Sequence, residues 1–424
     1  MLCHGARSPS WRCRALIQSH EQQRMRGEMG SGRAGFEKAS VYHQKVVSFG
    51  SDKYVIPLLQ PGQHNMPMAI GLEVCSSSQP IEDIERNIDD NRNERLYERR
   101  TRGGISSSSV VELRYVLRGK LACKVETEDE SSFDFLHVND RLFEAEAGDS
   151  VLFQKAGESR YEVVPSPSIT SSTTGMDSYV VSLVILLPTD LLRHNIIPPS
   201  LKGKNQNNDT WLSGYVECVA NSISMMWKGG SEGQALTIEE VDQILRQSWR
   251  ESTDPVDHLN FDNMHDSHQQ SGIVFRRNVL DSHVFQLTDT NSLALLLDPR
   301  NGYNVTFGVE IFEPGHKTQR HVHDGAIEVF FILSGRGVAF CDGETFNVRG
   351  GDIIAFRPGT VHAIDNIVTS TFKQKLYCLE LMVPNEAFAE FVTQAEETGL
   401  SDADICTLIS KRCGNDHQFE QSHQ

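Results

Sequence analysis

Residues 315–335 read GHKTQRHVHDGAIEVFFILSG, and this stretch decides the fold. Two histidines, His321 and His323, stand two positions apart, and after a short Asp-Gly turn Glu328 opens an apolar run. Side chains two residues apart in a strand point to the same side of the sheet, so both imidazoles should project into one space. Because Glu328 begins the next strand, its carboxylate can face both of them. The stretch predicts a pair of strands that brings two imidazoles and a carboxylate together.

His362 supplies a fourth group from farther along the chain. It follows a Gly-Asp turn, a β-run and the Pro-Gly pair at 358–359, and in a small closed barrel it can complete the set from a third strand. Unpaired polar groups of this kind inside a barrel are costly, and a bound cation removes that cost. Three imidazoles and one carboxylate suit Fe(II), Mn(II), Ni(II) or Zn(II), with metal–ligand distances of ~2.0–2.2 Å. We therefore expect one divalent metal ion.

The chain contains the same strand–turn–strand unit twice. ELRYVLRG at 112–119 matches EVFFILSG at 328–335, and GDSVLF at 148–153 matches GDIIAF at 351–356. The matches preserve both the spacing and the apolar pattern, which is typical of a repeated domain.

Short apolar runs separated by polar loops surround both copies. In the first block the predicted strands cover 54–59, 68–74, 112–117, 120–125, 150–154 and 179–187. In the second block they cover 284–287, 305–311, 329–333, 337–341, 352–356 and 376–382. Many short strands with Gly-rich turns indicate sandwiches or barrels, so the fold class is expected to be mainly β.

A helical region is predicted between the two blocks. Apolar residues recur at helical spacing from 211 to 226, and a capping box at Thr237 opens a second helix that runs to about 250. Two closing helices are expected at 386–395 and 402–409. The predicted domains are a disordered leader (1–40), a first barrel (41–190), a helical linker (191–271), a second barrel (272–383), and C-terminal helices with a tail (384–424).

In these residues the chain resembles the cupin superfamily. The first motif of that family, G-x5-HxH-x3,4-E-x6-G, is matched in full by 315–335. The second motif, G-x5-PxG-x2-H-x3-N, is matched by Gly351, Gly359, His362 and Asn366, with the proline one position late. The resemblance implies a bicupin of two tandem jelly-roll β-barrels, whose metal ligands are His321, His323, Glu328 and His362.

The first copy departs from the cupin pattern. Counted back from Glu112, its HxH positions fall on Ile105 and Ser107, and Ser159 or Arg160 stands near the place of the fourth ligand. Of the four ligands only Glu112 remains. We expect the first barrel to be degenerate, free of metal and structural.

Two side chains are expected to line a substrate pocket beside the metal. Phe330 and Ile332 share the strand parity of Glu328, and Phe307 is a third candidate. Plain barrel core is the alternative, because inward side chains fill a small barrel. No residue is singled out as a catalytic acid, base or nucleophile.

Four protein ligands on a six-coordinate metal leave two positions open for O₂ or for vicinal oxygens of a substrate. The resemblance therefore implies a metal-dependent enzyme, first a non-haem Fe(II) dioxygenase-type oxidoreductase that acts on a small organic molecule. One alternative is another metal-dependent cupin enzyme, an isomerase, lyase or decarboxylase that uses Mn, Ni or Zn. The other is a non-enzymatic bicupin that binds or stores a small molecule.

Composition limits the partners and the location. The 424 residues carry a formal net charge of −17, which argues against nucleic acid or an anionic membrane as the main partner. The first 28 residues lack the apolar core of a secretory signal, and nine scattered cysteines without a CxxC pair indicate reduced thiols. We expect a cytoplasmic protein with a small-molecule substrate and association into a homo-oligomer; transit to an organelle such as a plastid is the alternative.

Overall fold

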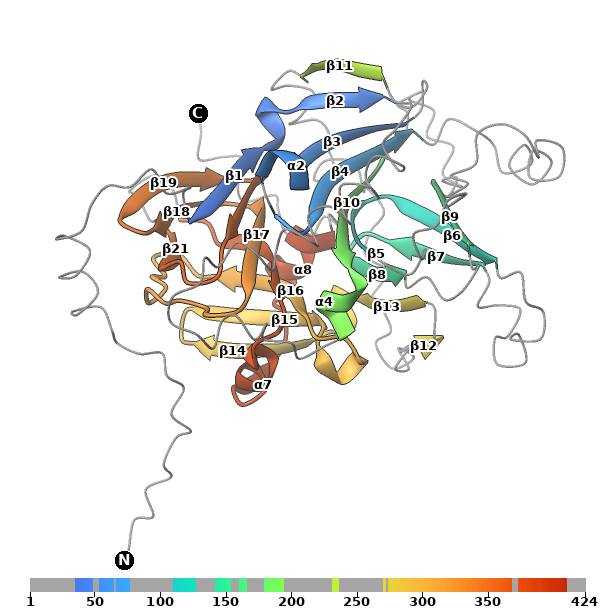
Figure 1. Cartoon of the computed structure of the whole chain (residues 1–424). Helices are drawn as coiled ribbons and strands as arrows, with labels where there is room; N and C mark the ends of the chain where they lie inside the picture. Colours follow the sequence, from blue (N-terminus) through green and yellow to red (C-terminus); the bar gives the residue numbers. More distant parts are fainter. Residues whose placement is uncertain are drawn as a thin grey trace, which may run out of the picture.

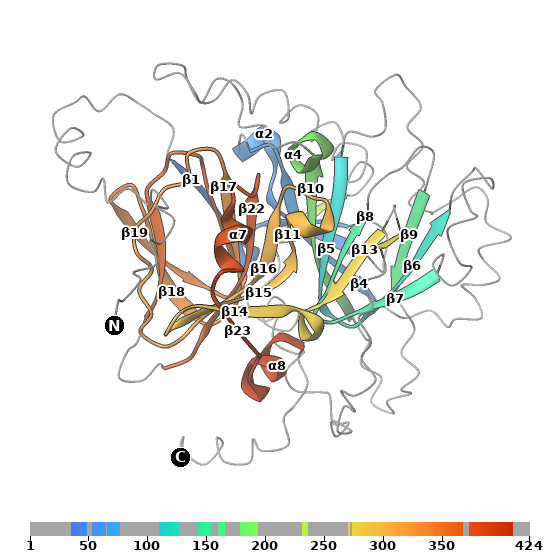
Figure 2. The same cartoon turned by 90° about the horizontal axis from the view of Figure 1, so that it is seen from below.

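The protein forms two β-barrels that lie side by side and share a core (Figure 1, Figure 2). The computed structural model describes residues 35–48, 53–64, 66–76, 110–126, 142–153, 160–165, 179–193, 231–235, 270–271, 274–367 and 373–409. Strands make up most of these residues, as the alternating apolar pattern predicts. The mainly β fold of two tandem jelly-roll barrels is confirmed.

Residues 36–271 contain twelve strands and three short helical turns within the described ranges. They are β1 (Phe36–Ser40), η1 (Val41–His43), β2 (Lys45–Ser48), β3 (Lys53–Leu59), α2 (Pro61–His64), β4 (Ala69–Ser76), β5 (Val110–Arg118), β6 (Lys120–Glu126), β7 (Leu142–Glu146), β8 (Asp149–Phe153), β9 (Arg160–Pro165), β10 (Tyr179–Pro188), α4 (Thr189–Arg193), β11 (Ser231–Ala235) and β12 (Gln270–Ser271).

Residues 274–409 repeat this arrangement. Its elements are β13 (Val274–Asn278), η7 (Val279–Asp281), β14 (His283–Thr288), β15 (Asn291–Leu297), η8 (Pro299–Asn301), β16 (Thr306–Phe312), β17 (Ile327–Ser334), β18 (Arg336–Cys341), β19 (Glu344–Arg349), β20 (Asp352–Phe356), β21 (His362–Asn366), β22 (Leu376–Val383), α7 (Phe388–Val392), β23 (Glu396–Thr398) and α8 (Asp402–Ile409).

Each barrel consists of one large and one small antiparallel sheet. In the first barrel the strand orders are β11-β2-β3-β4-β10-β5-β8-β13-β12 and β7-β6-β9. In the second they are β1-β20-β17-β22-β16-β15-β14-β23 and β19-β18-β21. The matching orders confirm that the sequence repeat is a structural repeat.

Strand register extends the repeat to single residues. Glu112 of β5 pairs with Phe153 of β8, and Glu328 of β17 pairs with Phe356 of β20. The Gly-Asp turns that lead into β8 and β20 also match, because each aspartate accepts a hydrogen bond from the backbone N–H three residues before it. The glycine of each turn, at 148 and 351, has a positive φ that other residues rarely adopt. Glu112 and Glu328 are therefore equivalent positions.

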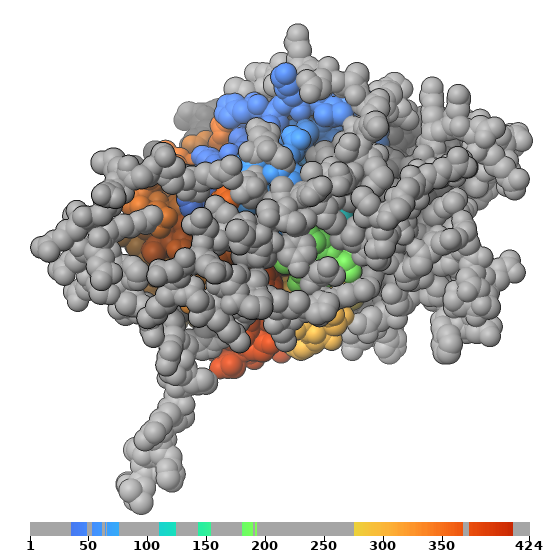
Figure 3. Space-filling model, viewed as in Figure 1, coloured from blue at the N-terminus to red at the C-terminus, as the bar shows by residue number. Residues whose placement is uncertain are grey.

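The two barrels exchange their first strands. β1 pairs with β20 in the second barrel, where Ser40 lies opposite Asp352. β13 pairs with β8 in the first barrel, where Asn278 lies opposite Asp149. Figure 1 shows the blue β1 lying against the orange strands, and Figure 3 shows the blue surface of the N-terminal region beside the orange surface of the second barrel.

This exchange corrects two predicted domain borders. The expected leader, 1–40, includes β1, which belongs to a sheet, and the expected second barrel, 272–383, begins with a strand of the first. Both errors have one physical cause: the pairing joins residues more than 120 positions apart, which local sequence patterns do not encode.

The twelve predicted strands are all confirmed, while several short strands, such as β7, β15 and β19, were not predicted. The helix predicted at 402–409 is confirmed as α8. The helix predicted at 386–395 is only α7, because Glu386 and Ala387 have left-handed backbone conformations. The predicted helices at 211–226 and 237–250 lie outside the described residues.

A single apolar cluster joins the two barrels. Tyr115 of β5 and Phe307 of β16 meet edge to face in it, with ring centroids 6.3 Å apart. From α8, Leu408 and Ile409 pack against the same cluster. No helix in the described ranges is both long and apolar enough to cross a membrane.

The thiols follow the sequence prediction only in part. Four described cysteines, at 75, 123, 341 and 378, are free and buried, whereas Cys406 is disulfide-bonded. The expectation of reduced thiols throughout the chain is therefore wrong at Cys406.

Candidate metal centre

Four side chains converge at one end of the second barrel. Glu328 lies at the start of β17 and His362 at the start of β21, and both are buried. His321 and His323 precede β17 and are half-buried. His321 pairs with His362 through two backbone hydrogen bonds of 3.1 and 2.9 Å, and Gly359 N donates to His323 O at 2.7 Å. Backbone pairing therefore holds the HxH segment beside β21.

The four candidate ligand atoms lie within 4.8 Å of one another. Glu328 Oε1 is 3.6 Å from His323 Nε2, and Glu328 Oε2 is 3.9 Å from His321 Nε2. Glu328 Oε2 also contacts His362 Nε2 directly. Ligands ~2.0–2.2 Å from one ion span such distances, so this group could hold a metal ion.

The orientation of the imidazoles fits a metal. His321 Nδ1 and His362 Nδ1 each lie 2.9 Å from a backbone carbonyl oxygen, which they can contact only by donating a proton. With Nδ1 protonated, the Nε2 lone pair of each neutral ring faces the cluster. His323 Nε2 is buried and makes no hydrogen bond with the described residues, which leaves that nitrogen available as a ligand.

The cluster is electrostatically coupled. Burial alone would raise the pKa of Glu328, but His362 and His323 hold it well below its ordinary value. Burial lowers the pKa of His321 to about 4, assisted by the neighbouring His362. For His323 the carboxylates of Glu328 and Glu386 outweigh burial and raise the pKa to about 10. A carboxylate that remains ionised next to imidazoles is a suitable donor set for a divalent cation.

Two further glutamates lie inside the second barrel, behind the candidate centre. Glu380 of β22 lies within hydrogen-bond reach of Glu328, and burial with the charges of Glu310 and Glu328 raises its pKa well above the ordinary value. Glu310 of β16 accepts a hydrogen bond of 2.7 Å from Asn291 Nδ2. Burial raises the pKa of Glu310 to about 8, although the Asn291 hydrogen bond opposes the shift.

The predicted pocket residues divide between two faces of the sheet. Phe330 and Ile332 lie in the apolar interior of the second barrel with Phe356. The Phe356 ring stacks on His362, with centroids 4.2 Å apart and planes 13° apart. Phe307 lies on the opposite face, in the core between the barrels, and so does not share a space with the other two.

The first barrel has a charge cluster at the equivalent positions. Arg114 Nε lies 2.5 Å from Glu112 Oε1, and Arg114 Nη1 lies 2.7 Å from Glu73 Oε1. Lys53 Nζ lies 2.7 Å from the other Glu73 oxygen. These two cations outweigh burial and lower the pKa of Glu73 to about 2. Ile105, Ser107 and Ser159 lie outside the described residues.

Residues 308–373, which include all four candidate ligands, match the family described as Cupin domain. The second barrel therefore carries a cupin domain. The match covers the part of the second barrel from β16 through β21.

Two curated proteins are similar to part of the chain. An uncharacterized protein of Methanocaldococcus jannaschii is 37% identical over 81 residues, which is 19% of this chain and 65% of that protein. An oxalate-binding protein of Thermotoga maritima is 34% identical over 53 residues, 12% of this chain and 44% of that protein. The chain thus spans less than two thirds of each relative.

Solved structures are similar to most of the chain at lower identity. The oxalate decarboxylase of Lactobacillus farciminis, in a formate complex, is 11% identical, with a TM-score of 0.44 over 88% of this chain and 90% of that one.

Sequence reasoning missed the carboxyl groups around the ligands. Glu310 and Glu380 each interrupt an apolar strand, and this local pattern could have identified them as buried polar residues. Glu386, by contrast, lies after a strand in an ordinary polar turn, and no local signal distinguishes it.

Proposed function

We propose that the second barrel holds one divalent metal ion, Mn(II) or Fe(II), and binds a small dicarboxylate such as oxalate at that ion. The proposed ligands are His321, His323, Glu328 and His362. The observation that carries the proposal is the convergence of their four ligand atoms within 4.8 Å. Two of the histidines turn Nδ1 toward backbone carbonyls, which supports Nε2 as the metal-binding atom.

A bound metal would supply a Lewis acid with open positions for substrate oxygens. The residues of this chain would prepare that position. Glu328 contributes the negative charge among the ligands, and the stacked Phe356 fixes the plane of His362. Phe330 and Ile332 bury the ligands on one side, next to Glu380, and this burial strengthens electrostatic attraction there.

Local similarity to an oxalate-binding protein supports a small dicarboxylate as the ligand class. It favours a metal-dependent decarboxylase, or a protein that binds the dicarboxylate without turnover, over the Fe(II) dioxygenase that we expected first. Decarboxylation of oxalate would yield CO₂ and formate with no net consumption of O₂. Product analysis therefore separates the reactions.

The experiment loads the full chain with Mn(II) or Fe(II), measures oxalate binding by calorimetry, and then assays formate, CO₂ and O₂ uptake. We expect binding by the metal-loaded protein and none by the chelator-treated protein. The double variant His321→Ala/His323→Ala should lose both metal and oxalate binding. A metal-loaded chain that fails to bind oxalate would refute the dicarboxylate proposal, and stoichiometric O₂ uptake would restore the dioxygenase hypothesis.

A further inference from the structure

A strained turn passes behind His323, between β22 and α7. Two successive residues other than glycine, Glu386 (φ 49°) and Ala387 (φ 63°), adopt the left-handed conformation. This conformation costs such residues roughly 1–2 kcal/mol each. Strain of this kind persists only where surrounding contacts enforce it, and it is concentrated at functional sites.

Asn385 provides the contacts that enforce the turn. Its Oδ1 accepts hydrogen bonds from Ala389 N at 2.9 Å and from Thr306 Oγ1 at 2.5 Å. Its Nδ2 donates to Glu390 Oε2 at 2.7 Å, and its backbone N donates to Asn304 O at 3.1 Å. The turn is thereby fixed both to α7 and to the start of β16.

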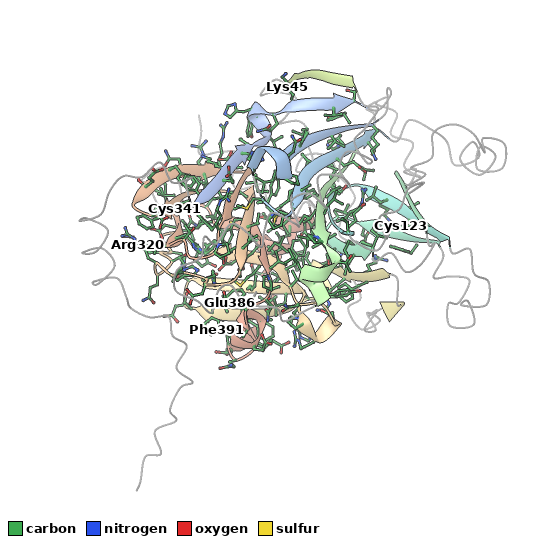
Figure 4. All side chains as sticks on the ribbon, viewed as in Figure 1. Lys45, Cys123, Arg320, Cys341, Glu386 and Phe391 are labelled. Carbon is green, nitrogen blue, oxygen red and sulfur yellow. The ribbon has the colours of Figure 1, made fainter. Side chains whose placement is uncertain are left out.

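The side chain that this turn presents to the centre is Glu386. Its Oε1 accepts a hydrogen bond of 2.9 Å from Gly325 N, in the connection between His323 and β17. Its Oε2 lies 3.6 Å from His323 Nδ1, just beyond hydrogen-bond distance, and that oxygen is buried without a hydrogen bond to any described residue. The Phe388 ring meets the same imidazole edge to face, with centroids 6.5 Å apart. In Figure 4 Glu386 is labelled close to Phe391, beside α7.

The three histidines are therefore held differently. His321 and His362 each face a neutral backbone carbonyl, whereas His323 alone faces a carboxylate. A carboxylate attracts the Nδ1 proton of an imidazole more strongly than a neutral carbonyl does, and it makes the opposite ring nitrogen a better electron-pair donor to a metal. Loss of an outer partner of this type lowers metal affinity by roughly 10–100-fold.

We propose that Glu386 is a positioning residue for the metal centre, which fixes the orientation of His323 and strengthens its Nε2 as a ligand. The inference rests on the metal-binding part of the proposed function and is independent of the dicarboxylate. It also gives the strained turn a role: the left-handed backbone aims Glu386 Oε2 at His323 while Oε1 remains bound to the ligand-bearing connection.

The test compares the full chain with Glu386→Gln, which preserves shape and removes the charge. Zn(II) and Mn(II) affinities are measured by competition with a chelator, and we expect them to fall roughly 10–100-fold. In ¹⁵N NMR of the Zn(II)-loaded protein, one of the three histidine Nδ1–H signals should move and the other two should stay. A merely structural role would not move one signal selectively.

Glu396→Gln serves as the matched control, because it removes the same charge from an exposed position of β23 that neither faces His323 nor contributes to the contacts of the turn. Its metal affinity and its three Nδ1–H signals should equal those of the parent. Equal losses in both variants, or unchanged affinity and signals in Glu386→Gln, would overturn the inference. A parent chain that binds no divalent metal at all would instead refute the proposed function.

Discussion

Glutamates occupy the same two positions in both barrels, but their surroundings differ. Glu112 is equivalent to Glu328, and strand register makes Glu73 equivalent to Glu310. All four side chains are buried. The pKa of Glu73 is lowered to about 2, whereas that of Glu310 is raised to about 8.

The difference arises from two neighbouring positions. Arg114, between the two glutamates of the first barrel, is replaced by Phe330 in the second, and Lys53 is replaced by Asn291. Each replacement removes a cation and leaves a neutral side chain. The first barrel therefore neutralises its carboxylates with its own side chains, whereas the second has no cation at these two positions, and its Glu328 lies in a group that could hold a metal ion. The two barrels therefore differ in their buried cations as well as in their histidines.

The most severe test installs the cation of the first barrel in the second. Phe330→Arg should place a guanidinium near Glu328 and the candidate divalent metal. Repulsion between the single and the double charge is ~7 kcal/mol at ~5 Å and an effective dielectric of ~20, which would lower metal affinity on the order of 10⁵-fold. Elemental analysis and chelator competition measure this loss. Phe330→Met, which remains apolar, should retain the metal. Full metal content in Phe330→Arg would show that the cation at this position does not distinguish the barrels.

The converse test removes the cation from the first barrel. Arg114→Met leaves Glu73 and Glu112 buried without their shared partner, and breaking such a pair costs ~3–5 kcal/mol. Denaturant unfolding should report that loss, while the metal content of the chain stays unchanged. Arg114→Lys keeps the charge and should lose less. A variant as stable as the parent would mean that the cluster contributes nothing to folding.

The smallest effect is a pair of opposite pH dependences in the metal-free protein. The folded pKa of Glu73 lies below its ordinary 4.5, so its charge stabilises the fold above pH 4.5, and this contribution is lost as the pH falls toward 2. The folded pKa of Glu310 lies above 4.5, so folding favours its neutral form, and stability declines as the pH rises from 4.5 to about 8.

Glu73→Gln and Glu310→Gln should remove these two slopes separately, each at most ~1.36 kcal/mol per pH unit. Urea unfolding at a series of pH values, with each variant compared with the parent, measures the difference. Slopes of the same sign would contradict the assigned environments.

Much of this architecture follows from local sequence. Strand alternation identified twelve strands, and the spacing of His321, His323, Glu328 and His362 placed four side chains that the fold does bring together. The parity of Phe330 and Ile332 also located them correctly in the barrel interior. These features depend on residues close together in the chain or on a short motif, which is why a single sequence is sufficient.

The remaining features depend on contacts between distant segments. The pairing of β1 with β20, and the approach of Glu386 to His323, bring together groups that are separated by intervening strands. Alternation along β16 does not reveal which face of the strand points into the second barrel. Phe307 lies on the other face, in the core between the barrels. Its true neighbour, Tyr115, belongs to the other barrel and is nearly 200 positions away.

The exchange of first strands has the geometry of a domain swap. Its two halves are equivalent, since β1 meets β20 and β13 meets β8 in the same register, and the helical turn that follows each strand donates to the glycine of the matching turn. In a protein with only one such barrel, the same contacts would have to form between two chains. The present chain therefore has the form of a strand-swapped dimer within one polypeptide, in which the barrel without the histidine motif and the barrel that carries it each depend on a strand from the other half of the repeat.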